Sequence, residues 1–165
     1  MVEQHRLQRT YPTTAEEVWE LWTTAPGIES WWAPDGFEVK VDELHLEPGG
    51  ALVYTMTATA PDQVEFMRNA GMPLATQSRK RFTEIERPTR LAYSSLVDFV
   101  PGVDPYEFMT VVDLEPHGSG VVVTMTVDPL HDEVWTERLL AGRGNELDNL
   151  GRVIERRRAG ERARG

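Results

Sequence analysis

The sequence predicts an α+β domain in which a long last helix lies across a curved antiparallel sheet. Two amphipathic helical patterns, at residues 14–22 and 135–154, stand on either side of a strand-rich middle. Each pattern has an apolar face, and both faces must be buried on the same sheet. A cavity between the last helix and the sheet is therefore the expected functional part.

The first elements are a strand at residues 5–11 and a helix that begins at Thr14. Thr14 and Glu17 have the spacing of a capping box, and Pro26 limits the helix at its other end. The helix carries an apolar stripe at i, i+3, i+4 and i+7, formed by Val18, Leu21, Trp22 and Ala25.

Trp31 and Trp32 follow on a short second helix or turn that ends at residues 34–36. Two rings of this size cannot both lie in a tight turn without packing on something. We therefore expect at least one of them to close one end of the core or of the cavity.

Six further segments have the pattern of strands, because turn signals rich in Gly and Pro separate them. They are residues 37–46, 50–59, 78–86, 90–98, 106–115 and 120–127. The short connections imply antiparallel hairpins and a sheet of six to seven strands. The run Gly118-Ser119-Gly120 is then a hairpin turn and not a nucleophile elbow.

Residues 61–76 interrupt this rhythm with a short helix and loop. The segment carries apolar side chains among turn residues, namely Phe66, Met67, Met72 and Leu74. We expect it to pack over the mouth of the cavity as a lid that is more mobile than the sheet.

The last helix begins after Pro129 or Asp132 and is expected to end near Arg158. Its buried stripe contains Trp135, Leu139, Gly142 with Arg143, Leu147, Leu150 and Ile154. Gly142 and Gly144 each disfavour the helix by about 1 kcal/mol, so we expect something to approach closely there. Arg143 either leaves a kinked helix for solvent or a carboxylate, or enters the cavity and anchors an anionic ligand.

Composition limits the possible functions. The chain has 165 residues, 40% of them hydrophobic, and no cysteine, so it can bury a core without disulfides or thiolate metal sites. The formal charge is -10, and residues 152–165 hold six Arg against two Glu, which leaves -14 on residues 1–151. Such an acidic body is not expected to bind nucleic acid.

The expected organisation is a single domain over residues 1–158 followed by a flexible, Arg-rich tail at 159–165. The N-terminus has no apolar leader pattern, and no apolar run reaches 18 residues. We therefore expect no membrane interaction and, by default, a cytoplasmic protein.

Five motifs resemble the bacterial single-domain branch of the Hsp90-ATPase-activator homologue family, which consists of START-like, helix-grip domains. They lie at residues 14–22, 31–37, 47–50, 84–91 and 142–150. The resemblance implies a β-α-α-β6-α order with a ligand cavity under the last helix. Members of this superfamily bind lipids, sterols, polyketides or antibiotics, and a few catalyse cyclisation or dehydration. The family's Gly-Trp pair reads Gly142-Arg143 here.

No constellation of catalytic residues is evident, and we predict no cofactor. The four histidines lack metal-ligand spacing; they are His5, His45, His117 and His131. His131 and Asp132 could orient one another as an acid-base pair, but a helix cap accounts for Asp132 more simply.

The aromatic and sulfur-containing side chains are the stronger functional signal, because period-two alternation places them on one face of the sheet. Each could equally be packed core. The predicted ligand-binding residues are Trp31, Trp32, Tyr54, Met56, Phe66, Met67, Tyr93, Tyr106, Phe108, Trp135, Leu139, Arg143 and Leu147.

Our first functional hypothesis is a non-catalytic carrier, sensor or sequestering protein for a small apolar or aromatic, and in one version anionic, ligand. It would act as a monomer or homodimer. A cyclase, dehydratase or hydrolase is the alternative, and it requires a titratable group in the cavity, such as Tyr54, Tyr93, His45 or Arg143. A co-chaperone or other interaction module would instead have a filled cavity and an exposed apolar patch near Trp31 and Trp32.

Overall fold

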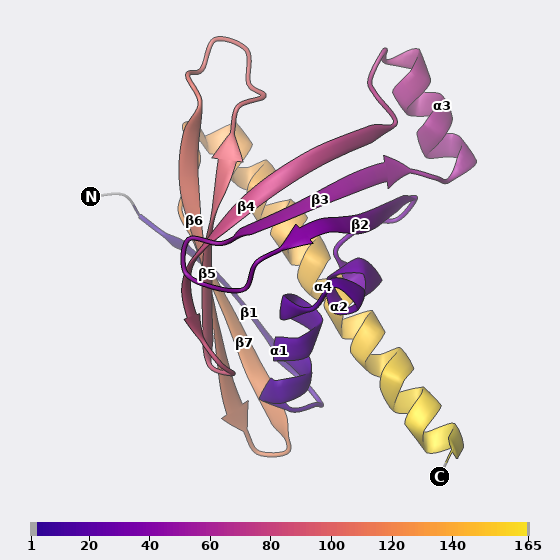
Figure 1. The fold of residues 1–165 in the computed structure, drawn as a ribbon, viewed down its shortest axis with the longest axis vertical. Coiled ribbons are helices and arrows are strands. Elements are labelled where there is room, and N and C mark those ends of the chain that lie inside the picture. Colours follow the sequence, from indigo (N-terminus) through magenta and orange to yellow (C-terminus); the bar gives the residue numbers. More distant parts are fainter. Residues whose placement is uncertain (1–2, 165) are drawn as a thin grey trace.

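The computed structural model describes residues 3–164, with side chains up to Glu161, and its strands form one antiparallel sheet (Figure 1). The sheet has seven strands in the order β1-β7-β6-β5-β4-β3-β2. The strands are β1 His5–Tyr11, β2 Phe37–Leu44, β3 Ala51–Ala58, β4 Ala75–Glu86, β5 Arg90–Val97, β6 Tyr106–His117 and β7 Gly120–Val127. The helices are α1 Ala15–Thr23, α2 Ala25–Trp31, α3 Pro61–Asn69 and α4 Glu133–Arg164.

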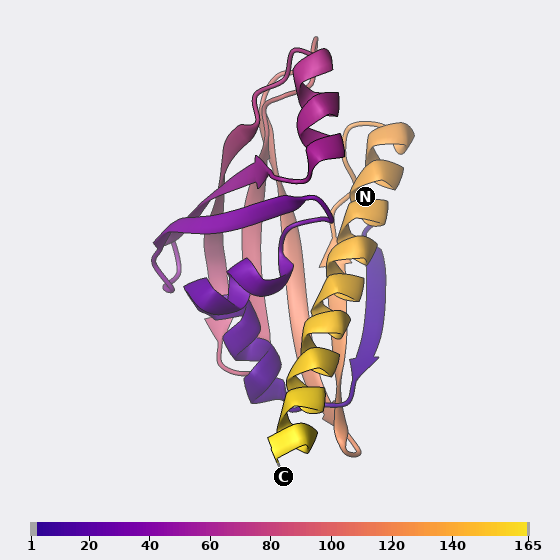
Figure 2. The ribbon, with the colours of Figure 1, turned by 90° about the vertical axis from the view of Figure 1, so that its right-hand side faces the viewer.

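Consecutive strands from β2 to β7 are neighbours in the sheet, and β1 returns to pair with β7 at the other end. The long helix α4 runs along one face of this sheet, with α1 and α2 beside it (Figure 2). The predicted α+β class, antiparallel sheet and long last helix are therefore confirmed.

Thr24 divides the first helical segment into two. Its backbone N–H donates to the Glu20 carbonyl and ends α1, while its side chain accepts a hydrogen bond from the Gly27 backbone N–H and begins α2. Ala25 therefore starts α2. The sequence pattern had placed it in the apolar stripe of α1, and this prediction is wrong. At the start of α1, Thr14 accepts from the Glu17 N–H at 3.1 Å, as the capping motif predicts.

Three tryptophans pack together in the core: Trp22 of α1, Trp31 of α2, and Trp32 directly after α2. Trp31 and Trp32 are each only 2% exposed, and the Trp31 ring lies 4.8 Å from the ring of Trp22. The Trp31 indole Nε1 donates to the Leu21 carbonyl at 2.8 Å, so its polar atom is satisfied as well. The expectation that at least one of Trp31 and Trp32 packs into the core is confirmed. The interaction-module hypothesis predicted an exposed apolar patch at these residues, and that prediction is wrong.

Two expectations about α4 need correction. The helix continues past Arg158 to Arg164, because the intervening Arg, Ala and Glu are good helix formers. Gly142 is exposed and a side chain there would meet nothing within 4 Å, while Gly144 would make only an ordinary contact with Arg9. The close approach occurs instead at Gly151, where an added Cβ would lie 3.2 Å from the Tyr11 ring.

The insert contains the expected short helix, α3, and a loop after it, and β4 already begins at Ala75. None of the α3 residues is buried, and Phe66 is 63% exposed. In Figure 1, α3 projects beyond the ends of β3 and β4. Across the described residues, no helix combines the length and the hydropathy needed to cross a membrane.

The different surroundings of Trp31 and Phe66 predict different effects of truncation. Trp31→Ala should lower the free energy of unfolding by about 3–5 kcal/mol, because it removes a buried ring and a satisfied hydrogen bond. Phe66→Ala is the control and should change it by less than about 0.5 kcal/mol. Urea denaturation followed by circular dichroism measures both, and similar midpoints for the two variants would contradict the placement of Trp31.

Candidate ligand-binding cavity

The cavity forms where β4 and β5 separate. The two strands pair from Glu86 and Arg90 up to Lys80 and Ser95, and no further. Beyond that point, residues 75–79 of β4 pair only with β3, and residues 96–97 of β5 pair only with β6. The sheet is thus forked, and Lys80 and Ser95 lie at the apex of the fork (Figure 1).

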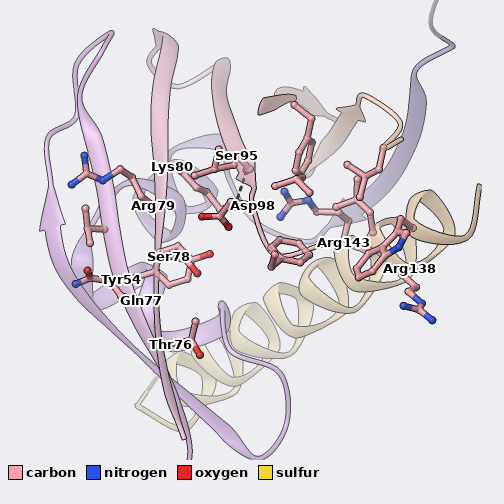
Figure 3. Close-up of a pocket in the computed structure, with 18 residues that line it drawn as sticks. Tyr54, Thr76, Gln77, Ser78, Arg79, Lys80, Ser95, Asp98, Arg138 and Arg143 are labelled. Carbon is pink, nitrogen blue, oxygen red and sulfur yellow. Dashed lines mark hydrogen bonds between the residues drawn. The ribbon is translucent and has the colours of Figure 1, made fainter. Parts of the chain in front are cut away.

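A cavity of about 730 Å³ occupies this fork beneath the N-terminal half of α4 (Figure 3). Side chains of β3 to β6, of the β5–β6 loop, of the β7–α4 loop and of α4 line it. The lining residues are Val53, Tyr54, Thr76, Gln77, Ser78, Arg79, Lys80, Ser95, Leu96, Val97, Asp98, Phe99, Phe108, Leu130, Trp135, Arg138, Leu139 and Arg143.

The tryptophan core lies next to the cavity. The Trp32 ring lies 6.0 Å from Tyr54 and 6.4 Å from Tyr93. Tyr54 belongs both to this core and to the cavity lining. The helices α1 and α2 therefore fill one part of the space between the sheet and α4, while the forked part stays open.

Five of the residues singled out in the sequence line the cavity: Tyr54, Phe108, Trp135, Leu139 and Arg143. The others lie elsewhere for identifiable reasons. Trp31, Trp32, Tyr93 and Leu147 are fully packed in the core, and Met56 is half-buried against it. Tyr106 contacts His131, and Phe66 and Met67 lie on α3, none of whose residues lines the cavity.

Arg143 is only 4% exposed and faces inward, so the alternative in which it reaches solvent is wrong. Its Nη1 lies 3.2 Å from the Glu146 carboxylate, and its Nη2 donates to the Thr110 Oγ1 at 3.4 Å. The expected carboxylate partner therefore comes from the next turn of α4 and not from the sheet. Burial lowers the pKa of Arg143, but Glu146 and further groups raise it above the ordinary value, so the guanidinium stays charged.

Lys80 is a second buried cation, and the sequence analysis missed it. The side chain is 8% exposed, and its Nζ donates to the Ser95 Oγ at 2.9 Å. Burial, with added repulsion from Arg143, lowers the pKa of Lys80 to about 7. Period-two alternation from buried Phe82 would have placed Lys80 on the inner face of β4.

Basic residues dominate the charge of the cavity wall. Arg79, Lys80, Arg138 and Arg143 line it, whereas Asp98 is the only acidic lining residue among those described. The cavity lining is therefore basic, whereas the chain as a whole carries a formal charge of -10.

Burial also raises the pKa of Tyr54, so its hydroxyl remains protonated at neutral pH. The Arg143 Nε is buried and has no hydrogen-bond partner, so a donor on the helix side remains unsatisfied.

His131 and Asp132 are positioned by the start of α4. The Asp132 Oδ1 accepts a hydrogen bond from the Trp135 backbone N–H at 2.8 Å, which confirms the capping role. The His131 Nδ1 lies 2.7 Å from the Tyr106 hydroxyl, and neither residue lines the cavity. Within residues 3–164, no group of three His, Asp or Glu side chains is arranged to hold a metal ion.

Comparison with known families gives one match. The model of the family described as Activator of Hsp90 ATPase homolog 1-like protein matches residues 12–155. Comparison with the curated proteins gives no match.

Solved structures share the fold at low sequence identity. A protein from Chromobacterium violaceum is 20% identical, with a TM-score of 0.70 over 93% of this chain and 98% of its own. A protein from Arthrobacter aurescens is 19% identical, with a TM-score of 0.72 over 93% and 86%. The AHSA1 protein from Silicibacter pomeroyi is 16% identical, with a TM-score of 0.70 over 93% and 98%.

The dependence of Arg143 on Glu146 can be tested by stability. Glu146→Gln leaves a buried guanidinium without its carboxylate, and Arg does not lose its proton, so the free energy of unfolding should fall by about 3 kcal/mol. Glu107→Gln removes the partner of exposed Arg81 and serves as the control, with an expected loss below about 1 kcal/mol. Equal urea midpoints for the two variants would show that the Arg143 pair does not matter for stability.

The lowered pKa of Lys80 predicts that this side chain reduces the free energy of unfolding by an amount that depends on pH. Between about pH 7 and the ordinary lysine pKa, the unfolded chain binds a proton that the folded chain does not, so the free-energy penalty that Lys80 imposes on folding decreases as pH rises. Lys80→Met should therefore raise the free energy of unfolding by roughly 2–5 kcal/mol at pH 6 and by much less at pH 10. Lys40→Met, at an exposed position, is the control. A stability gain that is independent of pH would contradict this assignment.

Proposed function

The chain belongs to the family of Activator of Hsp90 ATPase homolog 1-like proteins, and from this premise we propose that it binds a small, largely apolar, anionic ligand in the forked cavity. In this proposal the protein is a carrier, sensor or sequestering protein. The observation that carries it is the charge of the wall: four basic residues and one acidic residue line a cavity inside a chain of charge -10.

Two of the four basic residues, Arg143 and Lys80, are buried and could bind an anionic group of a ligand. Arg143 and Lys80 reach the cavity wall from different elements, Arg143 from α4 and Lys80 from β4 at the apex of the fork (Figure 3). Glu146 neutralises one of them, and Lys80 forms no ion pair among the described residues. A ligand carboxylate would pair with both cations. Because both are buried, the resulting charge-assisted hydrogen bonds would be stronger than those at a water-exposed site.

The remaining wall suits an apolar body. Phe108, Trp135, Leu139, Val97 and Leu130 supply apolar side chains to a cavity whose volume is within the usual range for small-molecule sites. Tyr54 and Ser78 add hydroxyl groups at the side of β3 and β4. An aromatic or fatty acid combines the apolar area and the single charge that this lining would recognise.

The enzymatic alternative retains support from a specific observation. It requires a titratable group in the cavity, and both Tyr54 and Arg143 line it. Tyr93 is instead buried in the core, and His45 is not part of the lining. A cyclase, dehydratase or hydrolase activity on the bound ligand is therefore our second candidate function.

The proposal predicts a preference for acids over neutral analogues. Naphthalene-2-carboxylic acid and decanoic acid should raise the melting temperature at pH 6.5 more than their primary amides do, because only the acids pair with Arg143 and Lys80. The preference should weaken at pH 9, where Lys80 has lost its proton. It should be lost in Arg143→Met and Arg143→Trp and reduced in Lys80→Met.

Arg81→Met is the matched control for these variants, since Arg81 lies on β4 but is exposed and paired with Glu107 outside the cavity. It should keep the preference of the wild type. Equal shifts for acids and amides in the wild-type protein would overturn the proposed anionic ligand.

A further inference from the structure

We propose that Lys80 is an imine-forming amine that captures an apolar aldehyde or ketone in the forked cavity, with an anionic group of the same molecule held by Arg143. The inference deepens the proposed function, because it rests on the cavity admitting an apolar anion, and it adds a covalent step. The substrate class is an oxo-acid whose carbonyl carbon reaches the apex of the fork while its carboxylate lies against α4.

The position of Lys80 supports this chemistry. Lys80 lines the cavity, and its Nζ makes one hydrogen bond, to the Ser95 Oγ, and lies 5.5 Å from the centre of the Tyr93 ring. The charged groups that act on it are Arg143 and Glu146, both from α4. No carboxylate forms an ion pair with Lys80 among the described residues, so no salt bridge must break before the amine can react.

The basic residues of the chain point to the same role. Of its 17 Lys and Arg, two are lysines, Lys40 and Lys80, and the other 15 are arginines. Lys40 is exposed on β2, whereas Lys80 is buried on the cavity wall. A guanidinium at this position could bind an anion but could not lose its proton and act as a nucleophile, whereas a desolvated lysine can.

The protonation state is compatible with reaction at neutral pH. With a pKa of about 7, roughly half of the Lys80 side chains are neutral at pH 7, whereas an exposed lysine is neutral in about one molecule in 3,000. Burial and, to a smaller extent, the neighbouring charge of Arg143 produce this effect, and desolvation or a nearby cation is known to activate lysine nucleophiles.

The step is balanced without an oxidant or reductant. The lone pair of the neutral Nζ attacks the carbonyl carbon, a C–N bond forms, and the carbonyl oxygen takes up a proton to give a carbinolamine. The nitrogen then expels this oxygen as water, so the two hydrogens of the amine leave with the oxygen and a C=N bond remains. The Ser95 hydroxyl, 2.9 Å from Nζ, is placed to relay a proton.

The experiment traps the imine by reduction. Wild-type protein, Lys40→Arg and Lys80→Arg are incubated at pH 7 with 4′-formylbiphenyl-4-carboxylate and cyanoborohydride, which reduces an iminium to a stable secondary amine. Peptide mapping by mass spectrometry then compares the rate of labelling at Lys80, at Lys40 and at the N-terminus. We expect Lys80 to be labelled at least about tenfold faster than Lys40 in the wild type. Lys40→Arg should keep this labelling, and Lys80→Arg should lose it.

A second measurement separates this inference from the proposed function. The matched compound 4′-methylbiphenyl-4-carboxylate has no carbonyl, so its effect on the melting temperature reports non-covalent binding alone. Lys40 labelled as fast as Lys80 overturns the imine, whether or not the methyl compound binds. Selective labelling of Lys80 supports the imine even if the methyl compound gives no shift, a result that would count only against the anion-binding function. The rate at Lys80 should also level off above about pH 7, while that at Lys40 continues to rise.

Discussion

The separation of β4 and β5 beyond Lys80 and Ser95 is the feature on which the site depends. Backbone groups need hydrogen-bond partners, and each diverging strand keeps one, because residues 75–79 pair with β3 and residues 96–97 pair with β6. The sheet can therefore open while β4 and β5 each keep backbone hydrogen bonds to one neighbouring strand. The tryptophans pack in the core beside α1 and α2, and the cavity lies in the fork.

The fork contains two buried cations, and the energetic cost of burying each charge is reduced in a different way. Arg143 keeps its charge because Glu146 supplies a carboxylate from the next turn of the same helix. Lys80 has no such partner, and the lowered pKa lets it shed its proton. This asymmetry follows from the chemistry of the two side chains, since a guanidinium cannot lose its proton in a protein and an ammonium can. The site thus combines a permanent positive charge with a conditional one.

Much of the fold was predictable because it is encoded locally. Turn residues and period-two alternation gave the strands to within a few residues, although β4 begins earlier than Ser78. The site was harder, because whether an aromatic side chain lines a cavity or fills the core depends on which other elements cover it. Tyr54 and Tyr93 have equivalent patterns, yet Tyr93 is buried in the core. Glycines were also misleading, since the close contact is at Gly151 and not at Gly142. The direction of Arg143 depends on the fork, which no local pattern reveals.

The two cations allow the position of a ligand's charge to decide what the cavity does with it. An anion placed against Lys80 would favour the protonated amine and raise its pKa, so the molecule would be held as an ion pair and the amine would be unreactive. An anion held by Arg143 alone would partly cancel the positive charge that repels a proton from Lys80, and it would leave the amine free of a direct ion pair. A molecule that carries both a carboxylate and a carbonyl would be oriented for reaction, whereas a simple acid would only be bound. In our proposal, storage and covalent capture are two consequences of one arrangement of charges.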